Sequence, residues 1–222
     1  MKILLSHPTG NANVRAVAEG LVKEDLLYEF HTTIASFPYN IYYMLGKIPL
    51  LGDFNRRSYS PLLKKYTRCH PLYELGRLFS SKVGLKKMIK HEEGIFSVDS
   101  IFQNFDKVVA GSVKNSRIEV VYAYEDGALN TFLSAKDKGI KCFYDLPIGY
   151  WRASKDMLKK EWDQRPEWGS TLGTFLNSDE KLLRKDLELE LADDIFVAST
   201  FTANTLKYYP GDLSKVHVIP YG

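Results

Sequence analysis

The residues best suited to chemistry gather in short polar segments that directly follow apolar runs. The first is the turn 6–11, in which Gly10 and Asn11 come shortly after the apolar run 3–5. A glycine lets backbone amides approach an anion, and the start of a following helix adds a partial positive charge. His7 lies in the same turn and is a candidate acid or base. A plain strand-to-helix turn explains the segment equally well.

A second polar segment, 122–128, places two phenols and two carboxylates at the end of another apolar run. Tyr124, Glu125 and Asp126 are therefore candidates to bind the hydroxyl groups of a ligand. Asp126 is also a second candidate for acid–base chemistry. In the alternative interpretation, Glu125 and Asp126 only complement the dipole of the helix that follows.

The third segment, 145–152, combines an aspartate at a strand end with an aromatic pair and an arginine. Aromatic faces stack on the C–H surfaces of sugars, and a guanidinium group binds phosphate or carboxylate through two parallel hydrogen bonds. Alternatively, the aromatic pair covers the core and the arginine pairs with a carboxylate. Ser199 or Thr200 can cap a later helix, and Ser199 would also face the ligand-binding cleft. The candidate ligand contacts here are Asp145, Gly149, Tyr150, Arg152 and Ser199.

Positive charge is concentrated in residues 46–91, which hold eleven Lys or Arg and two acidic residues. One interpretation is a solvated face. Another is docking on anionic lipid headgroups, which is worth about 1 kcal/mol per cation near the surface. Nucleic-acid binding is disfavoured because no recognised nucleic-acid motif is present. The cations expected to form a membrane or anion patch are Arg77, Lys82, Lys86, Lys87 and Lys90.

Alternating helical and strand patterns predict the elements that position these segments. Strands are expected at 2–6, 27–34, 119–123, 141–145, 194–198 and 216–219. Helices are expected at 11–24, 72–90, 99–113, 127–138, 153–163, 178–192 and 202–208, with short helices and a mobile loop in 37–71. Asn11 should cap the first helix, and Asn177 with Glu180 should form a capping-box-like pair.

Strands separated by helices predict an α/β fold. We expect one Rossmann-like three-layer domain, with a mostly parallel sheet and helices on both faces. Such sheets bind ligands beyond the carboxyl ends of their strands, where all three polar segments lie. The chain has 222 residues, a length that suits one large α/β domain.

Several classes of protein are disfavoured by composition. Cys69 and Cys142 show no metal-ligand spacing, so we expect no metal, and Cys142 reads as a core thiol. No signal peptide and no run of about 20 apolar residues is present, which favours a cytoplasmic protein. The dinucleotide glycine fingerprint is missing, which argues against an oxidoreductase, and no cofactor is expected.

The second half of the chain resembles the family 4 glycosyltransferases. The resemblance is carried by ELELADDIFVASTFTANTL, a helix–strand–helix segment, and by KVHVIPYG after it. The strand end EVVYAYEDGAL also looks like a family strand, although many relatives have histidine where this chain has Tyr122 and Tyr124. The likeness covers most of the chain and is strongest from Glu119 to Gly222.

This resemblance implies a GT-B architecture, with two Rossmann-like domains facing across a cleft. Residues 1–222 would form the N-terminal, acceptor-side domain, and the C-terminal donor-binding domain would be absent. The intact parent would be a retaining hexosyltransferase that moves a sugar from a nucleotide-sugar donor to a hydroxyl acceptor, a glycan or glycolipid. The isolated chain would have little activity, and a peripheral position at the inner face of a membrane is a further expectation. The alternative is a free-standing α/β binding module for an anionic ligand, a membrane surface or a protein partner.

Overall fold

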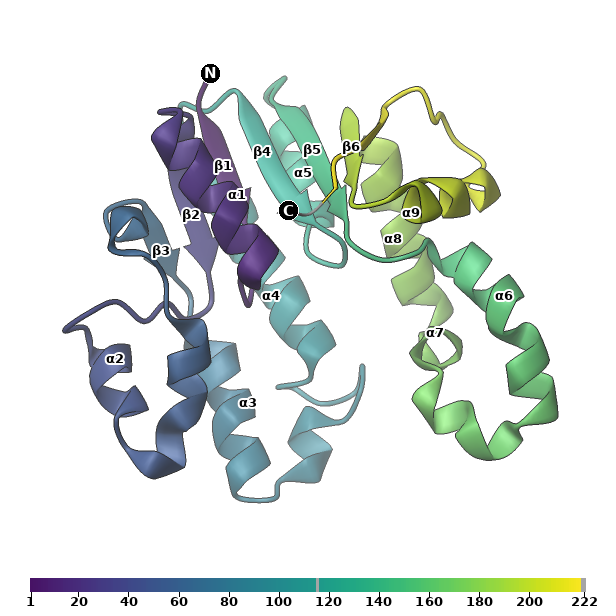
Figure 1. The fold of residues 1–222 in the computed structure, drawn as a ribbon, viewed down its shortest axis with the longest axis horizontal. Helices are drawn as coiled ribbons and strands as arrows, with labels where there is room; N and C mark the ends of the chain where they lie inside the picture. The colour runs from purple at the N-terminus through teal and green to yellow at the C-terminus, as the bar shows by residue number, and fades with distance from the viewer. Residues whose placement is uncertain (115, 221–222) are drawn as a thin grey trace.

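The computed structural model describes residues 1–114 and 116–220, and its centre is a seven-stranded parallel sheet (Figure 1). The strands follow one another across the sheet in the order β3-β2-β1-β4-β5-β6-β7. Because every pair is parallel, all the carboxyl ends lie at one edge. The strands are β1 (Ile3–Ser6), β2 (Leu27–Thr32), β3 (Thr67–Cys69), β4 (Val120–Tyr124), β5 (Lys141–Leu146), β6 (Asp194–Val197) and β7 (Val216–Val218).

Helices connect the strands and cover both faces, so the expected Rossmann-like three-layer α/β architecture is confirmed. The α-helices are α1 (Ala12–Lys23), α2 (Ile41–Gly46), α3 (Leu72–Lys82), α4 (Val98–Val113), α5 (Leu129–Lys136), α6 (Trp151–Gln164), α7 (Gly173–Leu176), α8 (Asp179–Leu191) and α9 (Thr200–Thr205). The 3-10 helices are η1 (Pro49–Arg57), η2 (Pro61–Leu63), η3 (Lys86–Ile89), η4 (Pro166–Thr171) and η5 (Leu206–Tyr208).

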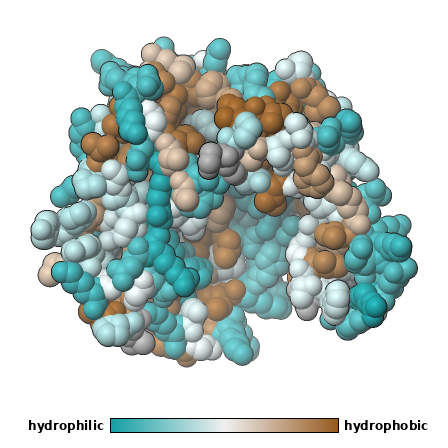
Figure 2. All heavy atoms as spheres, viewed as in Figure 1, coloured by the Kyte–Doolittle hydropathy of each residue, from teal (hydrophilic) through white to brown (hydrophobic). Residues whose placement is uncertain are grey.

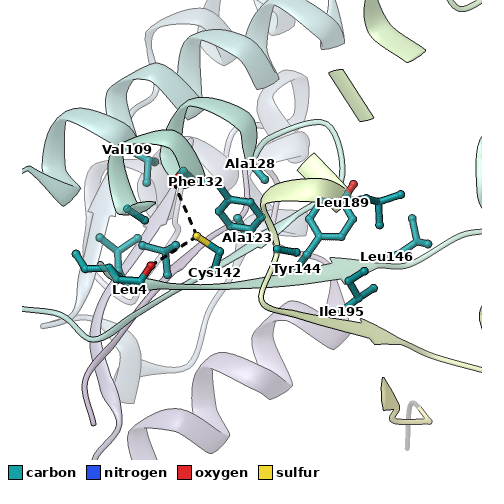
Figure 3. Packing of buried hydrophobic residues seen from close by; sticks show 14 of the residues in the cluster. Leu4, Val109, Ala123, Ala128, Phe132, Cys142, Tyr144, Leu146, Leu189 and Ile195 are labelled. Carbon is teal, nitrogen blue, oxygen red and sulfur yellow. Dashed lines mark hydrogen bonds between the residues drawn. The ribbon is translucent and has the colours of Figure 1, made fainter. Parts of the chain in front are cut away.

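The larger core lies between the sheet and helices α4, α5 and α8, on the face that we call the rear face. Tyr144 and Cys142 of β5 pack there against Phe132 of α5 and Leu189 of α8 (Figure 3). Cys142 is fully buried, which confirms the expected core thiol, and burial raises its pKa to about 12. A smaller core lies on the front face, where α1 packs on β1 and β2.

Two lobes extend beyond the carboxyl ends of the strands. The first lobe, residues 37–57 and 70–97, comes from the connections before and after β3 and contains α2, η1, α3 and η3; the second lobe, residues 147–178, contains α6, η4 and α7. Figure 1 places α2 and α3 at the lower left and α6 and α7 at the lower right. Figure 2 shows a hollow between these two groups of side chains.

Some expected elements differ from the observed ones. β3 was not expected, because Thr67–Cys69 is a short edge strand with a charged centre. The helix expected over 72–90 ends at Lys82, because Gly84 adopts a left-handed φ of 75° before η3 begins. Ser178 caps α8 by accepting from the amide of Lys181, so the expected pairing of Asn177 with Glu180 is wrong.

Other local expectations hold. The side chain of Asn11 accepts from the amide of Val14, as expected for the cap of α1.

Tyr221 and Gly222, which end the KVHVIPYG segment, lie outside the described residues. None of the helices in the described ranges is long and apolar enough to cross a membrane.

Candidate functional site

A pocket of about 450 Å³ lies between the two lobes, at the carboxyl ends of β4 and β5. We call it the rim pocket. It is lined by the loop after β4, by α8 and by residues of both lobes. The lining residues are His91, Asp126, Ile148, Gly149, Trp151, Gly173, Thr174, Leu176, Asn177, Lys181 and Lys185.

The two carboxylates after β4 are held by cations of α8. Lys185 Nζ lies 3.1 Å from Glu125 Oε1 and 3.3 Å from Asp126 Oδ2. Arg184 also reaches Asp126, at 3.1 Å. Although burial works against its charge, the nearby carboxylates raise the pKa of Lys185. The rim pocket therefore presents Asp126 as one member of an ion-pair network.

The amides that begin α5 are satisfied by two other carboxylates, which sequence reasoning missed. Glu188 of α8 accepts from the amides of Ala128 and Leu129 at 3.0 and 3.2 Å. Asp106 of α4 accepts from the amides of the next two residues, at 2.6 and 2.9 Å. Glu188 and Asp106 thus accept from the amides at the start of α5, whereas Glu125 and Asp126 pair with Lys185; that these two also complement the helix dipole remains a prediction.

Asp186 of α8 organises the segment after β5. Its carboxylate accepts hydrogen bonds from the Tyr150 hydroxyl and the Trp151 indole, each at 2.7 Å, and it pairs with Arg152. Tyr150 is only 1% exposed and packs in the rear core, so its ring is not available as a ligand-stacking surface. Trp151 is partly buried against the same core and also lines the rim pocket, together with Gly149. The alternative interpretation, in which the aromatic ring covers the core and the arginine pairs with a carboxylate, fits Tyr150 and Arg152.

Asp145 lies on the front face, in a different hollow. Its Oδ2 accepts from the Tyr122 hydroxyl at 2.9 Å. Both residues line an apolar groove of about 750 Å³ between α1 and strands β4 to β6. Phe196 stacks on the ring of Tyr122 in this groove, with centroids 5.6 Å apart. Tyr124 also faces α1, within the smaller core.

The turn after β1 borders a third hollow, which we call the arginine pocket. It has a volume of about 230 Å³ and is lined by Thr9, Gly10, Asn11, Arg15, Asp53, Arg56, Arg57, Arg77 and Leu78. Arg57 and Arg77 share a single buried carboxylate, that of Glu74. In the described part of the chain, the buried Nη1 of Arg57 has no hydrogen-bond acceptor. Sequence reasoning missed this cluster and grouped Arg77 with the lysines of the patch.

His7 holds the turn after β1 in place. Its Nδ1 accepts from the amides of Thr9 and Gly10 at 3.1 and 2.8 Å, so this nitrogen must be unprotonated. The ring packs edge-on against Tyr124, with centroids 4.8 Å apart. Burial lowers the pKa of His7 to about 4. A role in acid–base chemistry remains a prediction.

This depressed pKa gives a testable pH dependence. The unfolded state binds a proton on His7 near pH 6.5, whereas the folded state does so only near pH 4. Folding stability should therefore be lost as the pH falls through this window, by about 1.4 kcal/mol per pH unit from this group. His7→Asn keeps an acceptor but cannot titrate. Urea denaturation across the window should show the variant losing less stability than the wild type; parallel curves would contradict the assignment.

The remaining candidates have local roles or lie apart. Ser199 caps α9 by accepting from the amide of Thr202 at 3.1 Å. Lys82, Lys86, Lys87 and Lys90 lie on α3, η3 and the residue that follows η3. Among the described residues, no group of three or more His, Cys, Asp and Glu side chains is arranged to hold a metal ion. The expected site residues thus share one edge of the sheet but divide between several hollows.

Comparison with known proteins gives little further information. No family model and no curated protein sequence matches the chain. Among solved structures, it is similar to a UDP-glucosyltransferase from Polygonum tinctorium capable of glucosylating indoxyl, in complex with 3,4-dichloroaniline. The two are 13% identical with a TM-score of 0.41, and the match covers 100% of this chain and 52% of that one. The chain thus spans about half the length of that enzyme, and at this level the likeness implies no shared activity.

Proposed function

We propose that this chain is the acceptor-binding half of a retaining glycosyltransferase that uses a nucleotide-sugar donor and a hydroxyl acceptor. The acceptor, a glycan or glycolipid, binds in the rim pocket. The donor is held chiefly by a second domain, so the chain alone has little transfer activity. The proposal rests on the order of the sequence motifs and on the residues that line the rim pocket and the arginine pocket, at the carboxyl edge of the sheet.

The observation that carries the proposal is the composition of the rim pocket. Trp151 contributes aromatic surface to the pocket; its indole N–H is fixed by Asp186, and Arg152 lies over its ring with Cζ 4.3 Å from the centroid. Asn177 and Thr174 add neutral hydrogen-bonding groups to the same pocket. Apolar surface with a few converging polar groups is typical of small-molecule sites. The position, beyond the carboxyl ends of parallel strands, is where such folds bind ligands.

The arginine pocket suits a phosphoryl group of the donor or of the acceptor. Four arginines line it, and the carboxylates near them are Asp53 and the buried Glu74. Within α1, the amides of Ala12 and Asn13 have no carbonyl to which they can donate, and the helix dipole adds partial positive charge there. An excess of cations beside a helix start favours an anion.

Binding of pyrophosphate to the 222-residue chain tests this proposal by isothermal titration calorimetry. We expect weak binding, with a Kd of about 1 mM, because one domain supplies only part of the site. Arg56→Ala removes an exposed cation from the pocket and should weaken binding by roughly tenfold, since a hydrogen bond to a charged group contributes about 1.5–3 kcal/mol. Lys64→Ala, an exposed cation outside the pocket, is the control and should bind like the wild type.

The results separate the two functional classes. If Arg56→Ala binds pyrophosphate as well as the wild type, the pocket is not an anion site. Submicromolar binding of pyrophosphate by the chain alone would favour the free-standing binding module. Trp151→Ala, titrated with a panel of glycosides, would then show whether the rim pocket binds sugars at all.

A further inference from the structure

Helix α3 buries polar side chains and exposes apolar ones, which is the reverse of an ordinary surface helix. Its buried residues are Glu74 and Ser80, whereas Leu72 and Phe79 are 75% and 63% exposed. Val83, directly after the helix, is 51% exposed. Residues 72, 79 and 83 are spaced by seven and four, so their side chains share one face of the helix. This face is apolar and points away from the protein.

Further exposed apolar side chains lie on other elements of the first lobe. Leu85 and Met88, at and after the turn at Gly84, are 44% and 38% exposed. In α2, Ile41 and Met44 are 66% and 63% exposed. Figure 1 shows α2 and α3 at the end of the molecule that lies beyond the carboxyl ends of the strands. Single exposed apolar side chains are normal, but such a concentration on one lobe marks an interaction surface.

Positive charge borders this surface. Residues 72–90 hold five Lys or Arg and one acidic residue, Glu74, which is buried against Arg57 and Arg77. Lys86 and Lys87 are exposed on η3. Lys90 forms an exposed pair with Glu93, which contributes little in water. The surface therefore carries net positive charge beside its apolar side chains.

We propose that the α3–η3 face, residues 72–90, docks on the surface of a bilayer that contains anionic phospholipid. Leu72, Phe79 and Val83 enter the boundary between headgroups and acyl chains, and Lys86 and Lys87 contact lipid phosphates. Lysines can extend their chains along apolar surface while their ammonium groups reach the headgroups. Charge complementarity favours a lipid surface over an uncharged protein partner. This inference does not depend on the proposed transferase function.

Vesicle flotation with the 222-residue chain tests the inference. We expect the chain to float with vesicles of phosphatidylcholine mixed with phosphatidylglycerol, and far less with phosphatidylcholine alone or at high salt. Lys86→Glu/Lys87→Glu should weaken binding by at least 25-fold, because each cation contributes about fivefold near an anionic surface. Lys159→Glu/Lys160→Glu changes an exposed lysine pair on α6 in the same way and should have little effect.

The apolar contribution needs its own variants. Leu72→Ser/Phe79→Ser alters only exposed side chains, so the fold should persist, and flotation should be lost. Phe201→Ser is the matched control, since Phe201 is 60% exposed on α9, away from this face. Wild-type flotation by Leu72→Ser/Phe79→Ser, or binding that is equal on neutral vesicles, would overturn the proposal. So would a dimer in solution that this double substitution dissociates, because the face would then be an interface between two copies.

Discussion

Replacing Glu188 by alanine should destabilise the fold by about 3–5 kcal/mol, because several buried donors would lose their acceptor together. Glu188 is fully buried and accepts from the backbone amides of Asp126, Ala128 and Leu129. It also accepts from the Tyr144 hydroxyl at 3.1 Å. Alanine would leave these donors without a partner and open a cavity in the rear core. Chemical denaturation followed by tryptophan fluorescence measures the change.

Glu190 of the same helix provides the control. It is exposed, and Glu190→Ala should change stability by less than about 0.5 kcal/mol. Glu188→Gln keeps one carbonyl acceptor and should fall between the two. A loss below 1 kcal/mol for Glu188→Ala would show, by the usual range for buried unsatisfied groups, that water replaces the carboxylate at the start of α5.

The second large effect is expected for Gly10→Ala. Gly10 has a left-handed φ of 56°, which costs an L-residue about 1–2 kcal/mol. A Cβ atom there would lie 1.8 Å from the hydroxyl oxygen of Tyr59 and 2.8 Å from its Cζ. Overpacking of this kind adds about 1–3 kcal/mol, so the total loss should be roughly 2–5 kcal/mol. Thermal unfolding by circular dichroism measures it.

The clash and the backbone strain can be separated. Tyr59→Phe removes the nearest atom, so the double variant should recover part of the loss but keep the cost of the left-handed backbone. Gly20→Ala is the control, because Gly20 lies within α1 with nothing within 4 Å of an added Cβ. This substitution should stabilise the helix by about 0.5–1 kcal/mol. Equal stabilities of Gly10→Ala and the wild type would contradict the turn geometry.

Six of the seven strands could be predicted from sequence because each carries apolar residues between polar or turn-forming segments. The seventh, β3, could not, since Thr67–Cys69 is held by backbone pairing with β2 and carries no apolar pattern. The end of α3 was missed for a related reason. Apolar residues continue at helical spacing beyond Gly84, but several of them are exposed. Their spacing therefore does not indicate a helix that packs on the core.

The candidate site was predictable only in its location. A parallel sheet brings every loop that follows a strand to the same edge, so Gly10, Asp126 and Gly149 were correctly assigned to that edge. Which hollow each residue lines could not be read from the chain. Tyr150 and Trp151 are adjacent aromatics, yet one is buried in the core and the other lines the rim pocket.

The sequence by itself determined the alternation of strands and helices, the cap of α1, the buried thiol and the concentration of cations in residues 46–91, because these depend on local spacing and composition. Only the tertiary structure decided the partners of the charged groups. Glu188 meets the start of α5 from about 60 residues away, and Arg57 meets Glu74 across 17 residues. Charge patterns along a helix do not reveal such pairings, because an acidic residue on α8 looks the same in sequence whether it faces water or the amides of another helix.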